Sequence, residues 1–329
     1  GVGERYLIGD ILRNAEKFAG TEITVKGWVR SRRTQGKGGS LCFVVLSDGS
    51  STGNLQVISE YNITAGHDDI ISSAAGTGAA IAFRGTLVPS PAAGQAYELK
   101  ARLASVVGGV HIQDNGTETR VYPLAKKHHS LEVLRTLAHL RGRSNLGGAV
   151  ARVRNVLAKA IHDFLTERQF RYVQTPIITK SDCEGAGEAF SVNHVSSSSL
   201  TPSNLTETAR KSPENSKYFF GQPAYLTVSG QLNLEALCCS IGNVYCFGPT
   251  FRAEKSHTGR HLAEFWMLEP ELAFADMNDA ISLAEDLIRQ MANTVRERCG
   301  DEINFLAKFI DKTLPDRLLE MVQTPFARI

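Results

Sequence analysis

Residues 251–271 of this 329-residue chain read F-R-A-E-K-S-H-T-G-R-H-L-A-E-F-W-M-L-E-P-E, and they combine strand-like runs with a polar, basic turn. Runs rich in β-branched and aromatic residues predict two strands, over 243–254 and 263–274. Residues two apart on a strand share a face, so Arg252 and Glu254 point the same way. A guanidinium beside a carboxylate, a basic turn and the flat ring of Phe265 suit a nucleotide site. An ordinary hairpin with an ion pair on its wet face fits these residues equally well.

The same stretch resembles a known family. F-R-A-E, a short loop and R-H-L-A-E-F resemble the second motif of class II aminoacyl-tRNA synthetases, in the aspartate, asparagine and lysine subgroup. The runs Y-L-T-V-S-G-Q-L-N at 225–233 and S-D-C-E-G-A-G-E at 181–188 resemble asparaginyl-tRNA synthetases specifically. The resemblance implies an ATP-dependent ligase that activates L-asparagine as asparaginyl-adenylate. It then transfers asparagine to the 3′ end of asparagine tRNA in protein synthesis.

The resemblance also assigns roles to side chains of the hairpin. Arg252 and Glu254 are the implied catalytic residues. Arg252 would bridge the α-phosphate of ATP and the amino-acid carboxylate, and Glu254 would accept from adenine or orient the acceptor end of the tRNA. Arg260 and His261 would contact the outer phosphates of ATP. Phe265 would stack on adenine, although a core ring is the alternative for this residue.

The implied asparagine pocket has three parts that are separated in the sequence. The resemblance places Glu184, in a mobile glycine-containing loop, near the α-ammonium group, and adds Ser229 and Gln231 to the same pocket. Aspartate-charging relatives read S-P-Q-L-x-K and hold the substrate carboxylate with that lysine. Leu234 stands at the lysine position here and Glu235 follows it. An acid would repel aspartate and accept an amide N–H, so Glu235 is expected to select asparagine.

The first third of the chain alternates strand-like runs with glycine- and proline-containing turns. The expected strands are 23–29, 40–46, 55–58, 79–87 and 97–107. About five short strands in a hundred residues favour a small β-barrel, either an OB-fold or another type. The resemblance selects the OB-fold, in which Arg33, Phe43 and Gln56 would contact anticodon bases. Phe43 lies in L-C-F-V-V-L, where a buried core ring is a serious alternative.

The predicted fold class is α+β. The expected parts are an OB-fold anticodon-binding domain over 1–113, a hinge over 114–145 and a class II catalytic domain over 146–329, with an antiparallel sheet flanked by helices. Apolar residues at helical spacing predict helices over 150–164, 231–241 and 277–295. The first helix and a following strand over 170–178 resemble the family's first motif, which implies a homodimer. The Ser/Thr/Asn-rich segment within 194–217 is predicted to be a flexible insertion.

Bulk properties constrain the partners and the compartment. The net charge is only +2, but Lys26, Arg30, Arg32, Arg33 and Lys37 form a basic run without an intervening acid. Such a run suits a polyanion, or else a solvated face. The six cysteines lack zinc-site spacing and no apolar run approaches the ~18 residues of a membrane span. We therefore expect a cytoplasmic protein, or a mitochondrial or plastid one if a targeting segment precedes Gly1.

The chain ends at Ile329, before the third motif of the family. In the family that motif supplies a second arginine against adenine, and the same region holds the carboxylates that bind Mg²⁺. We therefore expect a C-terminally incomplete member whose metal ligands lie in the missing part and which does not aminoacylate tRNA alone. The alternatives are a catalytically inactive RNA-binding paralogue or fragment, and an aspartate-charging synthetase.

Overall fold

The computed structural model describes residues 5–91, 94–110, 122–124, 129–180, 183, 188–194, 218–254, 259 and 261–328. The chain divides into two compact units. The first unit comprises Gly1–Leu157 and Ala292–Pro325, and the second comprises Ala158–Met291 and Phe326–Ile329. Residues 195–217, which make up most of the predicted insertion, lie outside the described residues.

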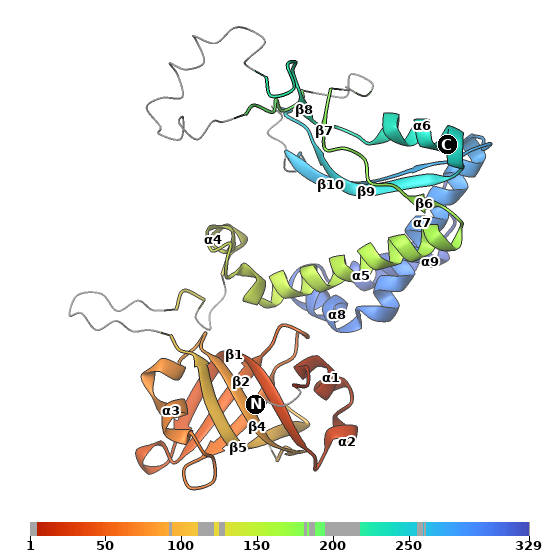
Figure 1. Ribbon diagram of the computed structural model, residues 1–329. Helices are drawn as coiled ribbons and strands as arrows, with labels where there is room; N and C mark the ends of the chain where they lie inside the picture. Colours follow the sequence, from red (N-terminus) through yellow and green to blue (C-terminus); the bar gives the residue numbers. More distant parts are fainter. Residues whose placement is uncertain are drawn as a thin grey trace, which may run out of the picture. The chain divides into compact units, whose positions relative to one another are not determined.

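A closed five-stranded barrel forms the start of the first unit (Figure 1). Its strands are β1 (Glu22–Gln35), β2 (Leu41–Ser47), β3 (Leu55–Glu60), β4 (Ala80–Pro89) and β5 (Tyr97–Gly108), in the order β1-β2-β3-β5-β4. Strand β1 closes the barrel by pairing with both β2 and β4. Alternation along β2 buries Cys42, Val44 and Leu46 completely and leaves the residues between them on the outer face. The predicted barrel is confirmed.

Strand β1 is longer than predicted. The sequence indicated an end at residue 29, but β1 continues to Gln35 because residues 31–35 pair with β2 after a register shift between Val29 and Ser31. Much of the predicted basic run therefore lies on a strand. Arg32 also donates to the carbonyl oxygen of Ile70 (2.6 Å), which ties this strand to the barrel's own helix.

Helices complete the first unit. They are α1 (Ile8–Arg13), α2 (Ala15–Phe18), α3 (His67–Ile71), α4 (Leu131–Thr136), the first part of α5 (Asn145–Glu167), α8 (Gly300–Phe309) and α9 (Leu314–Gln323), with short 3₁₀ turns at Lys37–Gly39, Ser73–Ala75 and Arg141–Arg143. The expected hinge thus contains α4, whose Leu134 packs with Leu124 and Leu140. Sequence periodicity was too short there to predict a helix.

The second unit is built on a three-stranded sheet in the order β10-β9-β6. Its elements are β6 (Arg171–Tyr172), β7 (Ile178–Thr179), β8 (Tyr225–Leu226), α6 (Gln231–Ile241), β9 (Val244–Phe251), β10 (Glu264–Glu271) and the larger part of α7 (Met277–Arg298). Strands β9 and β10 are antiparallel, which confirms the predicted hairpin, whereas β6 runs parallel to β9. The strand predicted over 170–178 forms only the short pieces β6 and β7.

The sheet packs against the end of α5 through a buried cluster of Phe164, Leu165, Phe170 and Tyr245. Of these residues, Phe164 belongs to the apolar spacing that predicted this helix. All six cysteines are free thiols. Among the described residues, no helix is both long enough and apolar enough to cross a lipid bilayer.

Candidate functional site

The hairpin gathers Arg252, His261 and Phe265, three of the predicted nucleotide-contacting residues, near Glu254. Arg252 follows β9 directly, and its backbone N–H donates to the carbonyl oxygen of Ala263 (3.1 Å). The Arg252 guanidinium lies 4.0 Å from the Glu254 carboxylate and 5.6 Å from the centroid of the Phe265 ring. His261 Nε2 lies 3.5 Å from the other Glu254 oxygen. The prediction that Arg252 and Glu254 share a face therefore agrees with the geometry.

These side chains line a cavity of about 460 Å³ in the second unit. Its lining residues are Phe190, Arg252, Ala253, Glu254, His261, Leu262, Ala263 and Phe265. About a third of the Arg252 side chain is exposed (32%), yet its Nε atom is buried and has no hydrogen-bond partner among the described residues. The exposed part of a guanidinium at a cavity wall is suited to binding an anion.

A second cluster surrounds the start of α6. Glu269 of β10 accepts hydrogen bonds from the Ser229 hydroxyl, from the Gly230 N–H (3.1 Å) and from the Cys246 thiol (3.2 Å). Ser229 Oγ in turn accepts from the Gln231 N–H (3.1 Å). One carboxylate thus holds the turn that presents Ser229 and Gln231. Sequence reasoning did not assign Glu269, although carboxylates alternating along β10 were visible in the sequence.

The structure separates Leu234 from Glu235. Leu234 is fully buried against Val244 and Cys246, whereas Glu235 is exposed and accepts a hydrogen bond from Gln231 Nε2 (2.8 Å). Residues four apart on a helix are neighbours, so α6 brings Gln231 and Glu235 together. The side chain at the lysine position of aspartate-charging relatives therefore belongs to the core here, and Glu235 faces outward beside Gln231.

Gly230 is constrained by its surroundings. A Cβ atom on Gly230 would lie 2.9 Å from both Cys246 Sγ and Thr175 Oγ1, closer than side chains normally approach. Proline occupies this position in the aspartate-charging pattern S-P-Q-L-x-K. A proline at this position would require the side chain of Cys246 or Thr175 to move.

Negative charge accumulates beside the start of α6. Burial raises the pKa of Glu271, and repulsion from Glu235 and Glu269 raises it further. Burial also raises the pKa of the Cys246 thiol, to about 12, with the hydrogen bond to Glu269 as the next cause. Three carboxylates in one neighbourhood disfavour a fourth and favour an ammonium or amide N–H.

Both clusters lie along one strand face. Phe265 and Glu269 are four residues apart on β10, so their side chains share a face and stand about 13 Å apart at ~3.3 Å per residue. Within the same unit, the backbone N–H of Phe251 donates to the carbonyl oxygen of Thr227 (2.9 Å), which fixes the segment before Ser229 against the end of β9. The arrangement suits one elongated ligand with an aromatic end, a central anion and a small polar end.

The barrel places the three remaining predicted contacts on its outer surface. Phe43 is half-buried between the inward-facing Cys42 and Val44, and the Arg33 guanidinium lies 4.6 Å from the centroid of its ring. The structure therefore excludes the alternative that Phe43 is a core ring. Gln56 Nε2 donates to the carboxylate of Glu98 (3.4 Å), a buried residue that sequence reasoning did not assign.

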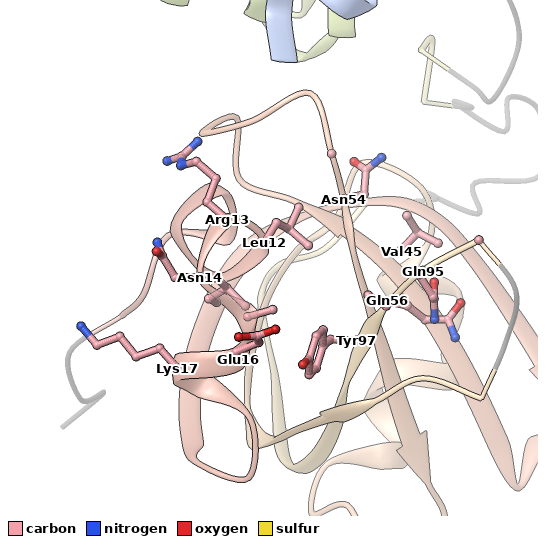
Figure 2. A pocket seen from close by; sticks show the side chains of 15 residues that line it. Leu12, Arg13, Asn14, Glu16, Lys17, Val45, Asn54, Gln56, Gln95 and Tyr97 are labelled. Carbon is pink, nitrogen blue, oxygen red and sulfur yellow. The ribbon is translucent and has the colours of Figure 1, made fainter. Parts of the chain in front are cut away.

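A cavity of about 870 Å³ adjoins Gln56. In Figure 2, Gln56 and Gln95 lie on one side of this cavity, Tyr97 lies near its middle, and Arg13 and Lys17 extend from α1 and α2 on the other side. Glu16 also lines the cavity, so its wall combines polar amides, a tyrosine ring, two cations and one carboxylate.

Comparison with known proteins matches each half of the chain to a family model. The model for an OB-fold nucleic acid binding domain matches residues 23–106, and the model for tRNA synthetases class II (D, K and N) matches residues 131–329. The chain belongs to the class II tRNA synthetases of the D, K and N group. The OB-fold and class II predictions are thereby confirmed.

Relatives and solved structures agree with this family. An asparagine–tRNA ligase of Shewanella denitrificans is 46% identical over 316 residues, which are 96% of this chain and 65% of the relative. One from Hahella chejuensis is 45% identical over 98% of this chain and 66% of its own length. Asparaginyl-tRNA synthetase of Pyrococcus horikoshii, complexed with asparaginyl-adenylate, superposes with a TM-score of 0.76 at 24% identity, covering 99% of this chain and 64% of that one. The chain thus spans about two thirds of the length of these relatives.

Two predicted site residues, Glu184 and Arg260, lie outside the described residues. In the part of the chain that the structure does describe, no group of three or more His, Cys, Asp and Glu side chains is arranged to hold a metal ion.

Proposed function

We propose that this protein is an asparagine–tRNA ligase, which activates L-asparagine with ATP as asparaginyl-adenylate and transfers it to the 3′ end of asparagine tRNA. The observation that carries the proposal is the pair of clusters on one face of β10. Phe265, Arg252 and Glu254 suit the nucleotide, and the turn held by Glu269 suits the amino acid. The names of the relatives point the same way.

In this proposal Arg252 supports adenylate formation. Its guanidinium binds the α-phosphate of ATP and the carboxylate of asparagine, so the attacking oxygen and the phosphorus are held in line. The exposed part of the guanidinium would donate to the charge that builds up on the phosphate oxygens. His261 and Arg260 contact the outer phosphates, and Phe265 stacks on adenine. Mg²⁺ would accompany ATP and would neutralise part of the charge on its phosphates.

Selection of asparagine over aspartate would come from the acidic neighbourhood of α6. Glu235 accepts an N–H of the side-chain amide in place of the one it accepts from Gln231. Aspartate would bring a further carboxylate next to Glu235, Glu269 and Glu271, where ionisation of Glu271 is already disfavoured. Ser229, Gln231 and Glu184 complete the amino-acid site.

The barrel would bind the anticodon loop. Phe43 stacks on a base, and Arg33 and Gln56 contribute a cation and an amide next to it. On the family resemblance we also propose a homodimer formed through the segment 150–178, and a reducing compartment, cytoplasmic or organellar.

The decisive experiment compares two non-hydrolysable adenylates. Isothermal titration calorimetry should show that an asparaginyl-adenylate analogue binds the chain at least about tenfold more tightly than the aspartyl analogue, the scale of one polar contact. Arg252→Lys should weaken the binding of both analogues. Equal affinity for the two analogues would refute the assignment to asparagine, and unchanged affinity in Arg252→Lys would refute the site.

A further inference from the structure

A second cavity in the first unit, of about 570 Å³, is lined by basic and aromatic side chains. We call it the basic pocket. The charged, titratable or aromatic residues among its lining are Trp28, Arg30, Tyr122, His139, Arg143 and Arg152. None of its described lining residues is acidic. Three guanidiniums around one cavity without a carboxylate in its wall favour an anionic ligand.

Two of these arginines are held by neutral acceptors. Arg30 donates to the carbonyl oxygen of Arg143 (2.7 Å) and to Asn145 Oδ1 (3.3 Å). Arg143 donates to the carbonyl oxygen of Gly78 (3.2 Å), and its guanidinium lies 4.9 Å from the centroid of the Trp28 ring. These contacts fix the position of both guanidiniums but do not neutralise their charge.

The third arginine is only partly compensated. Arg152 Nε donates to Glu302 (2.6 Å) and its Nη1 donates to the carbonyl oxygen of Gly49 (2.6 Å). Its Nη2 atom is buried and has no hydrogen-bond partner in the part of the chain that the structure describes. The basic pocket therefore combines fixed cations with the side chain of Trp28, which is 36% exposed.

The position of the basic pocket on the barrel indicates its occupant. Side chains along β2 point alternately inward and outward, so Phe43, Val45 and Ser47 share the outer face. Val45 and Ser47 line the basic pocket, and Val45 also lines the cavity beside Gln56. Phe43 and Ser47 are four residues apart, or about 13 Å at ~3.3 Å per residue. A nucleic-acid strand can follow this face from one cavity to the other, whereas a free nucleotide would fill only one.

We propose that the basic pocket binds a backbone phosphate of the RNA whose bases contact the outer face of β2. The bases would give sequence preference at Phe43 and Gln56, while the basic pocket would add affinity that does not depend on sequence. The identity of that RNA as asparagine tRNA rests on the proposed function. The proposal that the basic pocket binds a phosphate does not rest on that function.

The test introduces one negative charge into the basic pocket. Binding of asparagine tRNA to the full chain is measured by fluorescence anisotropy across a salt series. Ser47→Glu should weaken binding by about 5- to 10-fold and lower the salt slope by about one ion. Ser47→Gln controls for side-chain size and should keep parental affinity. Ser105→Glu adds the same charge to an exposed position of β5 that lines neither cavity, and should change affinity less than about twofold.

Circular dichroism checks that Ser47→Glu folds, and Thr77→Glu, at another lining residue, provides a second variant with the same expected loss. Equal effects of Ser47→Glu and Ser105→Glu would overturn the proposal. If the parent chain shows no preference among anticodons, the assignment to asparagine tRNA is refuted. A loss of RNA affinity confined to Ser47→Glu would still support the basic pocket as a phosphate site.

Discussion

Two substitutions on one strand face should change stability in opposite directions. Glu269 and Glu271 are two residues apart on β10, and both side chains are half-buried. Glu269 accepts hydrogen bonds from Ser229, Gly230 and Cys246. No donor to the Glu271 side chain is found among the described residues, and burial and two neighbouring carboxylates raise its pKa. We predict that Glu269→Gln destabilises the second unit and that Glu271→Gln stabilises it at neutral pH.

The magnitude for Glu269→Gln follows from its hydrogen bonds. A hydrogen bond to a charged group contributes about 1.5–3 kcal/mol, and a half-buried donor left unpaired costs about 1–3 kcal/mol. Glutamine keeps one carbonyl oxygen but turns an NH₂ group towards the remaining donors. We therefore expect the free energy of unfolding to fall by about 2 kcal/mol. This value is in the lower part of these ranges because Glu269 is not fully buried.

The sign for Glu271 follows from linkage between protonation and folding. Because its pKa is raised in the folded state, the folded chain holds more protons than the unfolded chain above the ordinary carboxyl pKa. Glu271 therefore contributes stability that is lost as the pH rises from the ordinary carboxyl range through the raised value. Glu271→Gln removes this loss. The variant should therefore be more stable than the parent at pH 7, and its free energy of unfolding should depend less on pH.

Urea unfolding can report on the second unit alone. The chain has two tryptophans, and Trp266 lies on β10 while Trp28 lies on the barrel, so a Trp28→Phe background leaves one reporter beside both glutamates. The slope of the transition should stay constant if only stability changes. Loss of stability in both variants, or no change in Glu269→Gln, would contradict the assigned hydrogen-bond network.

Three further predictions address the proposed sites. Arg252→Lys should weaken binding of the asparaginyl-adenylate analogue by about 10- to 100-fold in calorimetry, because lysine cannot make the paired guanidinium contacts. A loss below about twofold would assign the arginine a structural role. Glu235→Gln should reduce the preference for the asparaginyl over the aspartyl analogue by about 1–3 kcal/mol, and an unchanged ratio would move amide recognition elsewhere. Phe43→Ala should remove most of the preference for an asparagine anticodon loop over a scrambled loop in an anisotropy assay. The control is Val44→Ala, because Val44 is the next residue but is buried. This variant should have a lower melting temperature and keep that preference.

Local patterns determined which elements form. The alternation of buried and exposed residues in β2, the apolar spacing of α5 and the hairpin around the basic turn are each visible within ten to twenty residues, because strand and helix periods are properties of the local backbone. The same stretches carry the motifs that matched the family. The proximity of Arg252, Glu254 and Phe265 could therefore be predicted from sequence, since the hairpin that unites them is itself a local structure.

Tertiary structure alone decided which distant side chains meet. Glu269 became the partner of Ser229 through the packing of α6 against β10, and Glu98 became the partner of Gln56 through the parallel pairing of β3 with β5. The Arg152–Glu302 ion pair joins residues 150 positions apart. No local period encodes such contacts, because they depend on how whole elements bury their apolar faces against each other. The cluster of carboxylates beside α6 and the basic pocket are both products of that packing.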